Sequence, residues 1–259
     1  MSKDTTRTMP LTGHLGELRR RLVYCAAVLV VFVAAAFVFK DHVFAVLLYP
    51  LRDTGVTQLT TLGVTEPFMQ VLKISIYAGL AVTLPFMLYQ FWAFVMPALY
   101  QHQRRTVLPY TLATTVLFLG GAVFAYFIVL PVGLRFLVGY GGEAFDQLLQ
   151  AERYVTFVAT FLLAFGLVFE LPLIMLLLAW AGIVDHRKLR KVRRYAIVVE
   201  AIAAMVLTPS QDPLSMILML LPLMALYELG IWLARLATKR RERRNQEASE
   251  LVTQGEGTG

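Results

Sequence analysis

The sequence predicts an all-α integral membrane protein with six transmembrane helices in one bundle and both termini in the cytoplasm. The 259-residue chain is 58% hydrophobic and only 16% charged, whereas roughly 25% of the residues in soluble domains are charged. Its apolar residues gather in long runs, as a bilayer requires, because a spanning helix needs about 20 of them. The Lys and Arg residues lie between these runs, mostly on one side of the predicted bundle.

Six apolar runs predict the six helices. They cover residues 22–39, 68–97, 107–130, 154–183, 195–207 and 214–236. Turn and helix-ending residues, among them Pro50, Pro67, Pro97 and Pro131, lie at or near their ends. The fifth run is short, because its 13 residues reach only about 20 Å along a helix axis. Either the bilayer is thin at this helix or its ends are sunk in protein.

The distribution of positive charge predicts the orientation. Of the 24 Lys and Arg residues, 19 lie beside the predicted cytoplasmic ends and five on the opposite side. Cytoplasmic loops carry the excess of positive charge in membrane proteins, so both termini are expected in the cytoplasm. Residues 1–236 are expected to form the transmembrane domain and residues 237–259 a charged, disordered tail. We find no small-residue cleavage signal after the first run, which is therefore expected to be retained.

The sequence also excludes several classes of function. It has no GxxxxGK[ST] phosphate loop and no HExxH or GxSxG motif. All four histidines fall outside the apolar runs, so no pair can ligate a haem across the bilayer core. The lone Cys25 can form neither an intrachain disulfide nor a CxxC site. We therefore expect no enzyme activity, cofactor or metal. We also expect no nucleic-acid binding. The net charge is +7, but the Lys and Arg residues that produce it lie beside hydrophobic segments.

Three carboxylates interrupt the apolar runs, namely Glu170, Glu200 and Glu228. A charged side chain inside a bilayer costs on the order of 3 kcal/mol, so each should face protein or water. Pro172 removes a backbone donor near Glu170, which makes that region a candidate docking point for a polar residue of another helix. For Glu200 and Glu228, packing against a neighbouring helix is the simpler interpretation.

The segment before the first run carries one acid among arginines. Glu17 and Arg21 are four residues apart, a spacing that allows an ion pair worth a few tenths of a kcal/mol on a helix. A binding role for Glu17 and a purely local pair remain equally open on these grounds.

Several motifs, in order along the chain, resemble the TatC family, the signal-receptor subunit of the twin-arginine protein translocase. They include HLGELRRRL, Glu66-Pro67-Phe68, YQFWAFVMPALYQHQRR, AYFIVLP, FGLVFELP, LRKVRRY and MVLTP. The resemblance extends to about residue 236. It implies a concave, glove-shaped bundle in the cell inner membrane that receives folded precursors and forms oligomeric complexes. It also implies that transport is driven by the proton-motive force.

The resemblance further implies which residues bind the signal peptide. They are Glu17, Arg19, Phe94, Gln103, Arg104 and Arg105. The chain departs from the family at Gln103, where Glu is usual. A carboxylate can accept two charge-assisted bonds from a guanidinium, whereas a Gln carbonyl offers only neutral acceptance. Arginine recognition at this position is therefore expected to be weaker.

By the same resemblance, Glu170 would be the acid that lines the membrane concavity. The site for the single-helix partners TatA and TatB would include Met205, Thr208 and Pro209 in the 205–209 segment. Glu200 has no counterpart in the family pattern and is a candidate second polar docking group. Two rival functions stay open: a proton-coupled carrier of small solutes using Glu170 and Glu200, and a structural membrane anchor.

Overall fold

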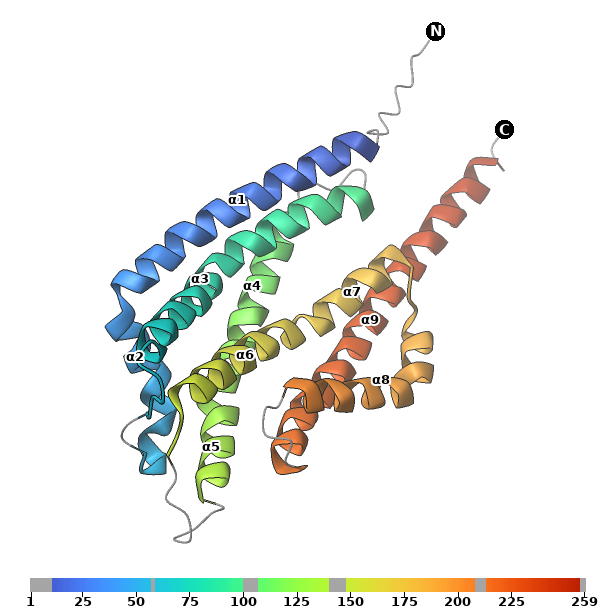
Figure 1. Ribbon diagram of the computed structural model, residues 1–259. Helices are drawn as coiled ribbons and strands as arrows, with labels where there is room; N and C mark the ends of the chain where they lie inside the picture. Colours follow the sequence, from blue (N-terminus) through green and yellow to red (C-terminus); the bar gives the residue numbers. More distant parts are fainter. Residues whose placement is uncertain (1–10, 57–58, 100–106, 140–147, 208–212, 257–259) are drawn as a thin grey trace. The chain divides into compact units, whose positions relative to one another are not determined.

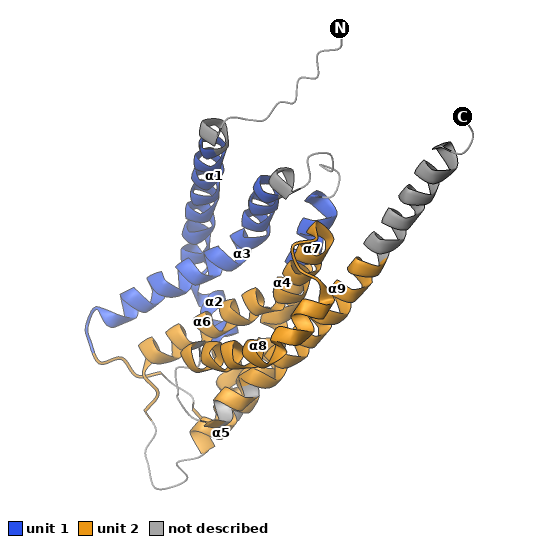
Figure 2. Ribbon diagram, turned by 90° about the vertical axis from the view of Figure 1, so that its right-hand side faces the viewer, with its two compact units in different colours: residues 1–47, 63–115 blue, residues 48–62, 116–259 orange. Residues whose placement is uncertain are grey.

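The computed structural model describes residues 11–56, 59–99, 107–139, 148–207 and 213–256. Within these residues the regular structure is helical, with one isolated parallel bridge between Thr60 and Gln150 (Figure 1). The chain divides into two compact units (Figure 2). Unit 1 contains residues 1–47 and 63–115, and unit 2 contains residues 48–62 and 116–259.

Unit 1 is built on two long helices. The helices α1 (Leu11–Val38) and α3 (Glu66–Leu99) lie side by side over much of their length (Figure 1). The unit also contains most of α2 (Lys40–Leu48) and the first half of α4 (Val107–Phe124). The backbones of α1 and α3 approach closely at Gly79, where an added Cβ would lie 2.7 Å from the backbone nitrogen of Val33. Small residues allow such close approach between membrane helices.

Unit 2 contains the remaining elements. They are the 3₁₀ helix η1 (Tyr49–Thr54), the end of α4, the π turn η3 (Ala125–Val129), α5 (Leu130–Gly139), α6 (Ala151–Phe169), α7 (Leu171–Ala181), α8 (His186–Leu207) and α9 (Pro213–Glu256). Helix α9 packs against both α7 and α8. Alanines 179, 234 and 237 are buried between α7 and α9, so small side chains again mark a helix contact.

The third apolar run does not end at Pro131 as expected. The helix continues through the π turn η3 into α5 and reaches Gly139. Pro131 has no N–H group to donate to the preceding turn, which normally breaks the α-helical ladder. Here Leu130 donates to the carbonyl of Ala125, five residues earlier. The π turn precedes Pro131, and the chain remains helical through it.

Five helical segments are long and apolar enough to cross a membrane. Among the described residues they cover Leu15–Val38, Glu66–Val95, Val107–Gly139, Ala151–Ala181 and Met219–Lys239. These five correspond to five of the six predicted runs. The remaining run, residues 195–207, is the second half of α8, whose first half carries six Lys and Arg residues. The sixth span and the cytoplasmic termini therefore stay predictions.

Helix α9 passes residue 236 without interruption and ends at Glu256. Its last part is rich in Lys, Arg, Glu, Gln and Ala, all of which are favourable in helices. The backbone of residues 237–256 is thus helical, where the sequence predicts a disordered tail. The domain boundary at residue 236 stays a prediction.

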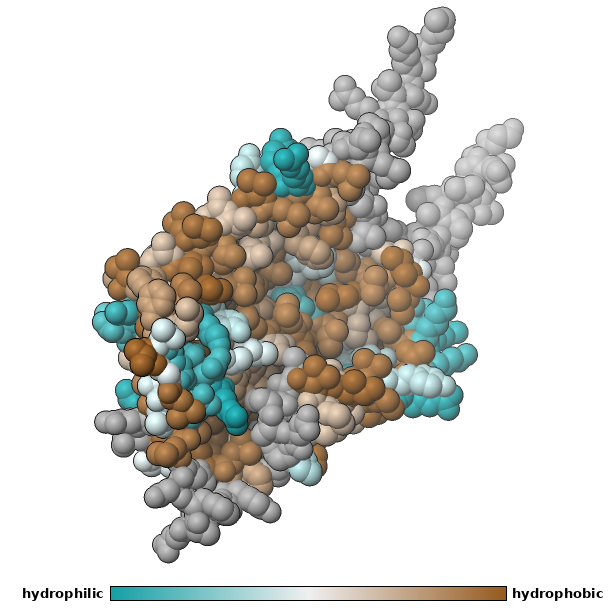
Figure 3. All heavy atoms as spheres, in the orientation of Figure 1, coloured by the Kyte–Doolittle hydropathy of each residue, from teal (hydrophilic) through white to brown (hydrophobic). Residues whose placement is uncertain are grey.

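Apolar side chains cover much of the described surface, as the brown areas of Figure 3 show. Val30 of α1 and Val116 of α4 are each 66% exposed, and Val206 of α8 is 76% exposed. Large exposed apolar surfaces mark contact with a membrane or another protein. Together with the five long apolar helices, this surface fits a chain surrounded by lipid.

Replacement of Gly79 by Ala should destabilise unit 1 by about 1–3 kcal/mol, because the new methyl group meets the backbone of Val33 as well as its side chain, and the backbone cannot easily move aside. Thermal unfolding of the purified protein in detergent measures the effect. Gly120→Ala is the matched control, since a Cβ on Gly120 meets nothing within 4 Å. Equal Tm values for the two variants would show that α1 and α3 do not touch at this glycine.

Candidate functional site

Glu17 lies in the second turn of α1 and is paired with Arg21 one turn later. One carboxylate oxygen, Oε1, accepts hydrogen bonds from both Nη2 (2.5 Å) and Nε (3.1 Å) of Arg21. The Glu17 side chain is 26% exposed and the Arg21 side chain 21% exposed. The local pair predicted from the spacing of the two residues is therefore present, in a half-buried setting where solvent screens it incompletely.

Arg21 also reaches across to α3. Its Nη1 donates to Oε1 of Gln90 at 2.7 Å, and Nη2 approaches the backbone carbonyl of Ala93 at 3.4 Å. Ala93 immediately precedes Phe94, one of the residues that the sequence assigns to signal binding. Through Arg21, the structure brings Glu17 to the part of α3 that carries Phe94.

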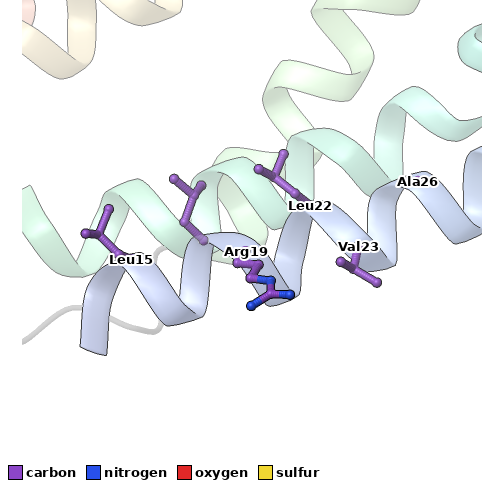
Figure 4. Close-up of a pocket in the computed structure, with 6 residues that line it drawn as sticks. Leu15, Arg19, Leu22, Val23 and Ala26 are labelled. Carbon is purple, nitrogen blue, oxygen red and sulfur yellow. The ribbon is translucent and has the colours of Figure 1, made fainter. Parts of the chain in front are cut away.

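Arg19 lies on a different side of α1 from Glu17. Two residues of an α-helix are separated by about 200° around the axis, so Arg19 does not join the network formed by Glu17 and Arg21. It lines a shallow groove of about 400 Å³ together with apolar side chains of the same helix (Figure 4). The other lining residues are Leu15, Leu18, Leu22, Val23 and Ala26.

A buried tryptophan joins the end of α3 to the start of α4. The indole N–H of Trp92 donates to the hydroxyl of Thr114 at 3.2 Å. The ring centroids of Trp92 and Tyr110 are 4.7 Å apart in an edge-to-face arrangement, which is favourable between aromatic rings. These contacts hold together the two helix ends that flank residues 100–106. Gln103, Arg104 and Arg105 belong to that segment and lie outside the described residues.

Glu170 lies where α6 ends and α7 begins. Its carbonyl accepts bonds from Leu173 (3.1 Å) and Ile174 (3.0 Å), so the chain turns directly from one helix into the next. Pro172 follows in the first turn of α7, a position that tolerates proline because its missing N–H would have no partner there. The Glu170 side chain is buried at 5% exposure. Both its carboxylate oxygens lack a hydrogen-bond partner among the described residues.

The two other intramembrane acids differ in their surroundings. Glu200 on α8 is also buried, at 6% exposure, and both its oxygens lack a hydrogen-bond partner within the described ranges. Glu228 on α9 is 45% exposed and pairs with Nε of Arg193 at 2.6 Å. Packing against a neighbouring helix therefore describes Glu228 well. Glu170 and Glu200 are instead buried polar groups whose carboxylates accept no hydrogen bond from the described part of the chain.

The remaining residues predicted for partner docking lie at the end of α8. Met205 is 51% exposed on that helix. Thr208 and Pro209 follow α8 directly and fall outside the described residues. In the part of the chain that the structure describes, we find no group of three or more His, Cys, Asp or Glu residues able to hold a metal ion.

Sequence reasoning missed that Arg21 bonds to Gln90 of α3 and that Trp92 bonds to Thr114 of α4. A weak signal was present, because Gln90 is a polar residue within a long apolar run. Glu17, Arg21 and the buried Cys25 also recur at every fourth position, which places them on one face of the helix. Neither pattern, however, states which residue of another helix lies opposite.

The fold and these sites define a class of protein: a multi-span helical membrane protein with a basic-acidic site at one end of a helix pair and buried acids within its apolar helices. Comparison with known protein families identifies the particular family within this class. The family described as Sec-independent protein translocase protein (TatC) matches residues 13–222. The chain belongs to the TatC family, and it is a transport component rather than an enzyme.

Individual relatives agree with this assignment. The chain is 40% identical over 240 residues to the Sec-independent protein translocase protein TatC of Aquifex aeolicus (strain VF5), covering 90% of this chain and 98% of the relative. The protein of the same name from Desulforapulum autotrophicum is 38% identical over 253 residues, covering 96% and 93%. A solved crystal structure of the twin-arginine translocase receptor TatC superposes with a TM-score of 0.78 at 38% identity. It covers 87% of this chain and 99% of that one.

Replacement of Glu170 by Gln should leave the Tm unchanged or raise it. The carboxylate has no hydrogen-bond partner to lose among the residues that the structure describes, and an amide of similar volume avoids burying a charge. Thermal unfolding in detergent tests this, with Glu170→Ala as a comparison that should lower the Tm by opening a cavity. If Glu170→Gln unfolded as easily as Glu170→Ala, the carboxylate would have to make a bond that the amide cannot replace.

Proposed function

We propose that this chain is the receptor and core subunit of a twin-arginine translocase, and that Glu17 captures the arginines of signal peptides on folded precursors. One observation supports this most directly: the Glu17 carboxylate already accepts two hydrogen bonds from a guanidinium, that of Arg21. The position is therefore chemically suited to bind arginine. Family membership and the resemblance to a solved twin-arginine translocase receptor support the same function.

The surroundings of Glu17 favour recognition at one end of unit 1. Arg21 connects Glu17 to the α3 segment that carries Phe94. The Trp92 contacts hold the start of α4 beside the end of α3. Gln103, Arg104 and Arg105 belong to the chain between these helices in the sequence and are proposed to contact the peptide as well. This end is proposed to face the cytoplasm, with both termini there, in accord with the positive-inside distribution.

Charge contacts alone do not account for useful affinity. A micromolar complex requires about 8 kcal/mol, whereas a partly exposed ion pair contributes about 1 kcal/mol or less. The apolar stretch of a signal peptide must supply the remainder. Leu22 and Phe91, each next in sequence to a member of the Arg21 network, are 61% and 52% exposed. Such side chains offer apolar contact, while the arginines would fix the register of the peptide.

Partner recruitment is proposed to use the buried acids and the end of α8. A polar side chain of a TatA-type or TatB-type helix could give Glu170 the hydrogen bond that it lacks among the described residues. Met205 presents an exposed side chain, and Thr208 and Pro209 follow it in sequence. Glu200 would be a second polar docking group. The assembly would work in the cell inner membrane and use the proton-motive force.

The two rival functions are not favoured. A proton-coupled solute carrier would use Glu170 and Glu200 as relay groups, and a structural anchor would need no recognition site. The comparisons instead place the chain in a family of protein translocase components over most of its length. A carrier or an anchor would also leave the paired acid and arginine at the start of α1 without a role.

Replacement of Glu17 by Gln should weaken binding of a twin-arginine signal peptide by at least about tenfold, because charge-assisted acceptance is lost. Binding of a labelled peptide to the full-length protein in lipid nanodiscs, at fixed salt, measures this. Glu152→Gln, at the exposed start of α6, makes the same change in net charge and should leave binding unaltered. Undiminished capture by Glu17→Gln would refute the proposed role of this acid.

Replacement of Gln103 by Glu should strengthen binding of the same peptide. A second carboxylate would add charge-assisted bonds that a neutral amide does not offer. The gain should shrink as the salt concentration rises, because exposed charge pairs are screened. A titration at two salt concentrations tests both expectations. Unchanged or weaker affinity would remove residue 103 from the recognition site.

A further inference from the structure

Arg21 occupies the same carboxylate that a signal arginine would use. Its Nε and Nη2 groups converge on Oε1 of Glu17 at 3.1 Å and 2.5 Å. Both donors share this one oxygen, and both hydrogen bonds are charge-assisted, which makes them stronger than bonds between neutral groups. An incoming arginine therefore meets an acid that already holds an arginine.

The pair is electrically neutral, because a guanidinium stays charged in proteins and cancels the carboxylate. A cationic peptide gains little from approaching a neutral pair, and Arg21 itself repels it. The side chains are only 21% and 26% exposed, so water screens this repulsion incompletely. For strong capture, the incoming group must take over bonds that Arg21 now makes.

Helix α3 already supplies Arg21 with acceptors other than Glu17. Its Nη1 already donates to Oε1 of Gln90 at 2.7 Å, and Nη2 lies 3.4 Å from the carbonyl oxygen of Ala93. If Glu17 turned to another partner, these two acceptors would still hold the guanidinium. Release of Glu17 therefore costs less than stripping a half-buried arginine of all its partners, which would leave a charged group unsatisfied.

We propose that Arg21 is a built-in competitor for Glu17, which an incoming signal arginine displaces onto the Gln90 and Ala93 acceptors of α3. This inference rests on the proposed function, since it concerns the same carboxylate. It also gives a reason for selectivity between cations. A second guanidinium can replace both bonds that Arg21 gives up, whereas a lysine ammonium is a compact charge that cannot reproduce the planar fork.

The first test removes the competitor. Arg21→Gln in the full-length protein in nanodiscs should raise the affinity for a twin-arginine peptide by about tenfold or more. It should also reduce the preference for that peptide over a twin-lysine version. Arg20→Gln is the matched control, because it removes the same charge from an exposed neighbouring residue. It should affect both peptides alike. A gain no larger than that of Arg20→Gln, or a loss of affinity, would overturn the inference.

The second test keeps Arg21 and removes its alternative acceptor. Gln90→Leu should weaken binding of the twin-arginine peptide, because a displaced Arg21 would lose its hydrogen bond to α3. In the Arg21→Gln background the same change should have a much smaller effect, which a double-mutant cycle measures as coupling. Equal effects of Gln90→Leu in both backgrounds would contradict the displacement scheme.

The Glu17→Gln variant separates failure of this inference from failure of the proposed function. If Glu17→Gln still captures the peptide, the function proposed for Glu17 is wrong. Arg21 then has no binding site for which to compete with the peptide. If Glu17→Gln loses capture while Arg21→Gln shows no gain, Glu17 is a receptor residue and Arg21 is not its competitor.

Discussion

The guanidinium of Arg21 links α1 to α3 at the end of unit 1 that carries Glu17. It binds an acid on its own helix and an amide on α3, at 2.5 Å and 2.7 Å, and a carbonyl of α3 lies within its reach. A planar group with five N–H donors can satisfy several acceptors at once, which a lysine in the same place could not do in this geometry. Through this contact, Glu17 is connected to the α3 segment that carries Phe94.

Packing of the apolar helices follows a different rule. Lipid is as apolar as the side chains that face it, so close contact between helices has to come from small residues and polar groups. Gly79 allows α1 to approach α3, and Gly230 of α9 lies against Pro172 and Met175 of α7. Pro172, one of the residues that Gly230 contacts, lies two residues after Glu170 in the sequence. The buried acid is therefore set in a tightly packed part of unit 2.

The acids of unit 2 show how burial separates structural from functional candidates. Glu228 is half exposed and has Arg193 as its partner. Solvent and this ion pair therefore offset the free-energy cost of placing its charge on an apolar helix. Glu170 and Glu200 are buried, and neither has a hydrogen-bond partner among the described residues. A buried polar group without a partner is expensive. The partner docking that we propose for the two acids would give each of them a polar partner.

The sequence by itself determined the helical membrane class and five of the long apolar helices, and its spacing allowed the pairing of Glu17 with Arg21. Each of these depends on local spacing, because a bilayer requires every backbone group to be satisfied within its own helix. It could not predict that the helix through Pro131 continues by way of a π turn, since proline usually ends a helix.

Only the tertiary structure decided which faces of the helices meet. Arg21 and Gln90 are 69 residues apart in the sequence, and no periodic pattern links them. The separation of Arg19 from the Arg21 network, in contrast, follows from spacing along α1 alone, because residues two positions apart on a helix are about 200° apart around its axis. Spacing along a helix fixes which residues share a face, but the partner of that face depends on packing between distant segments.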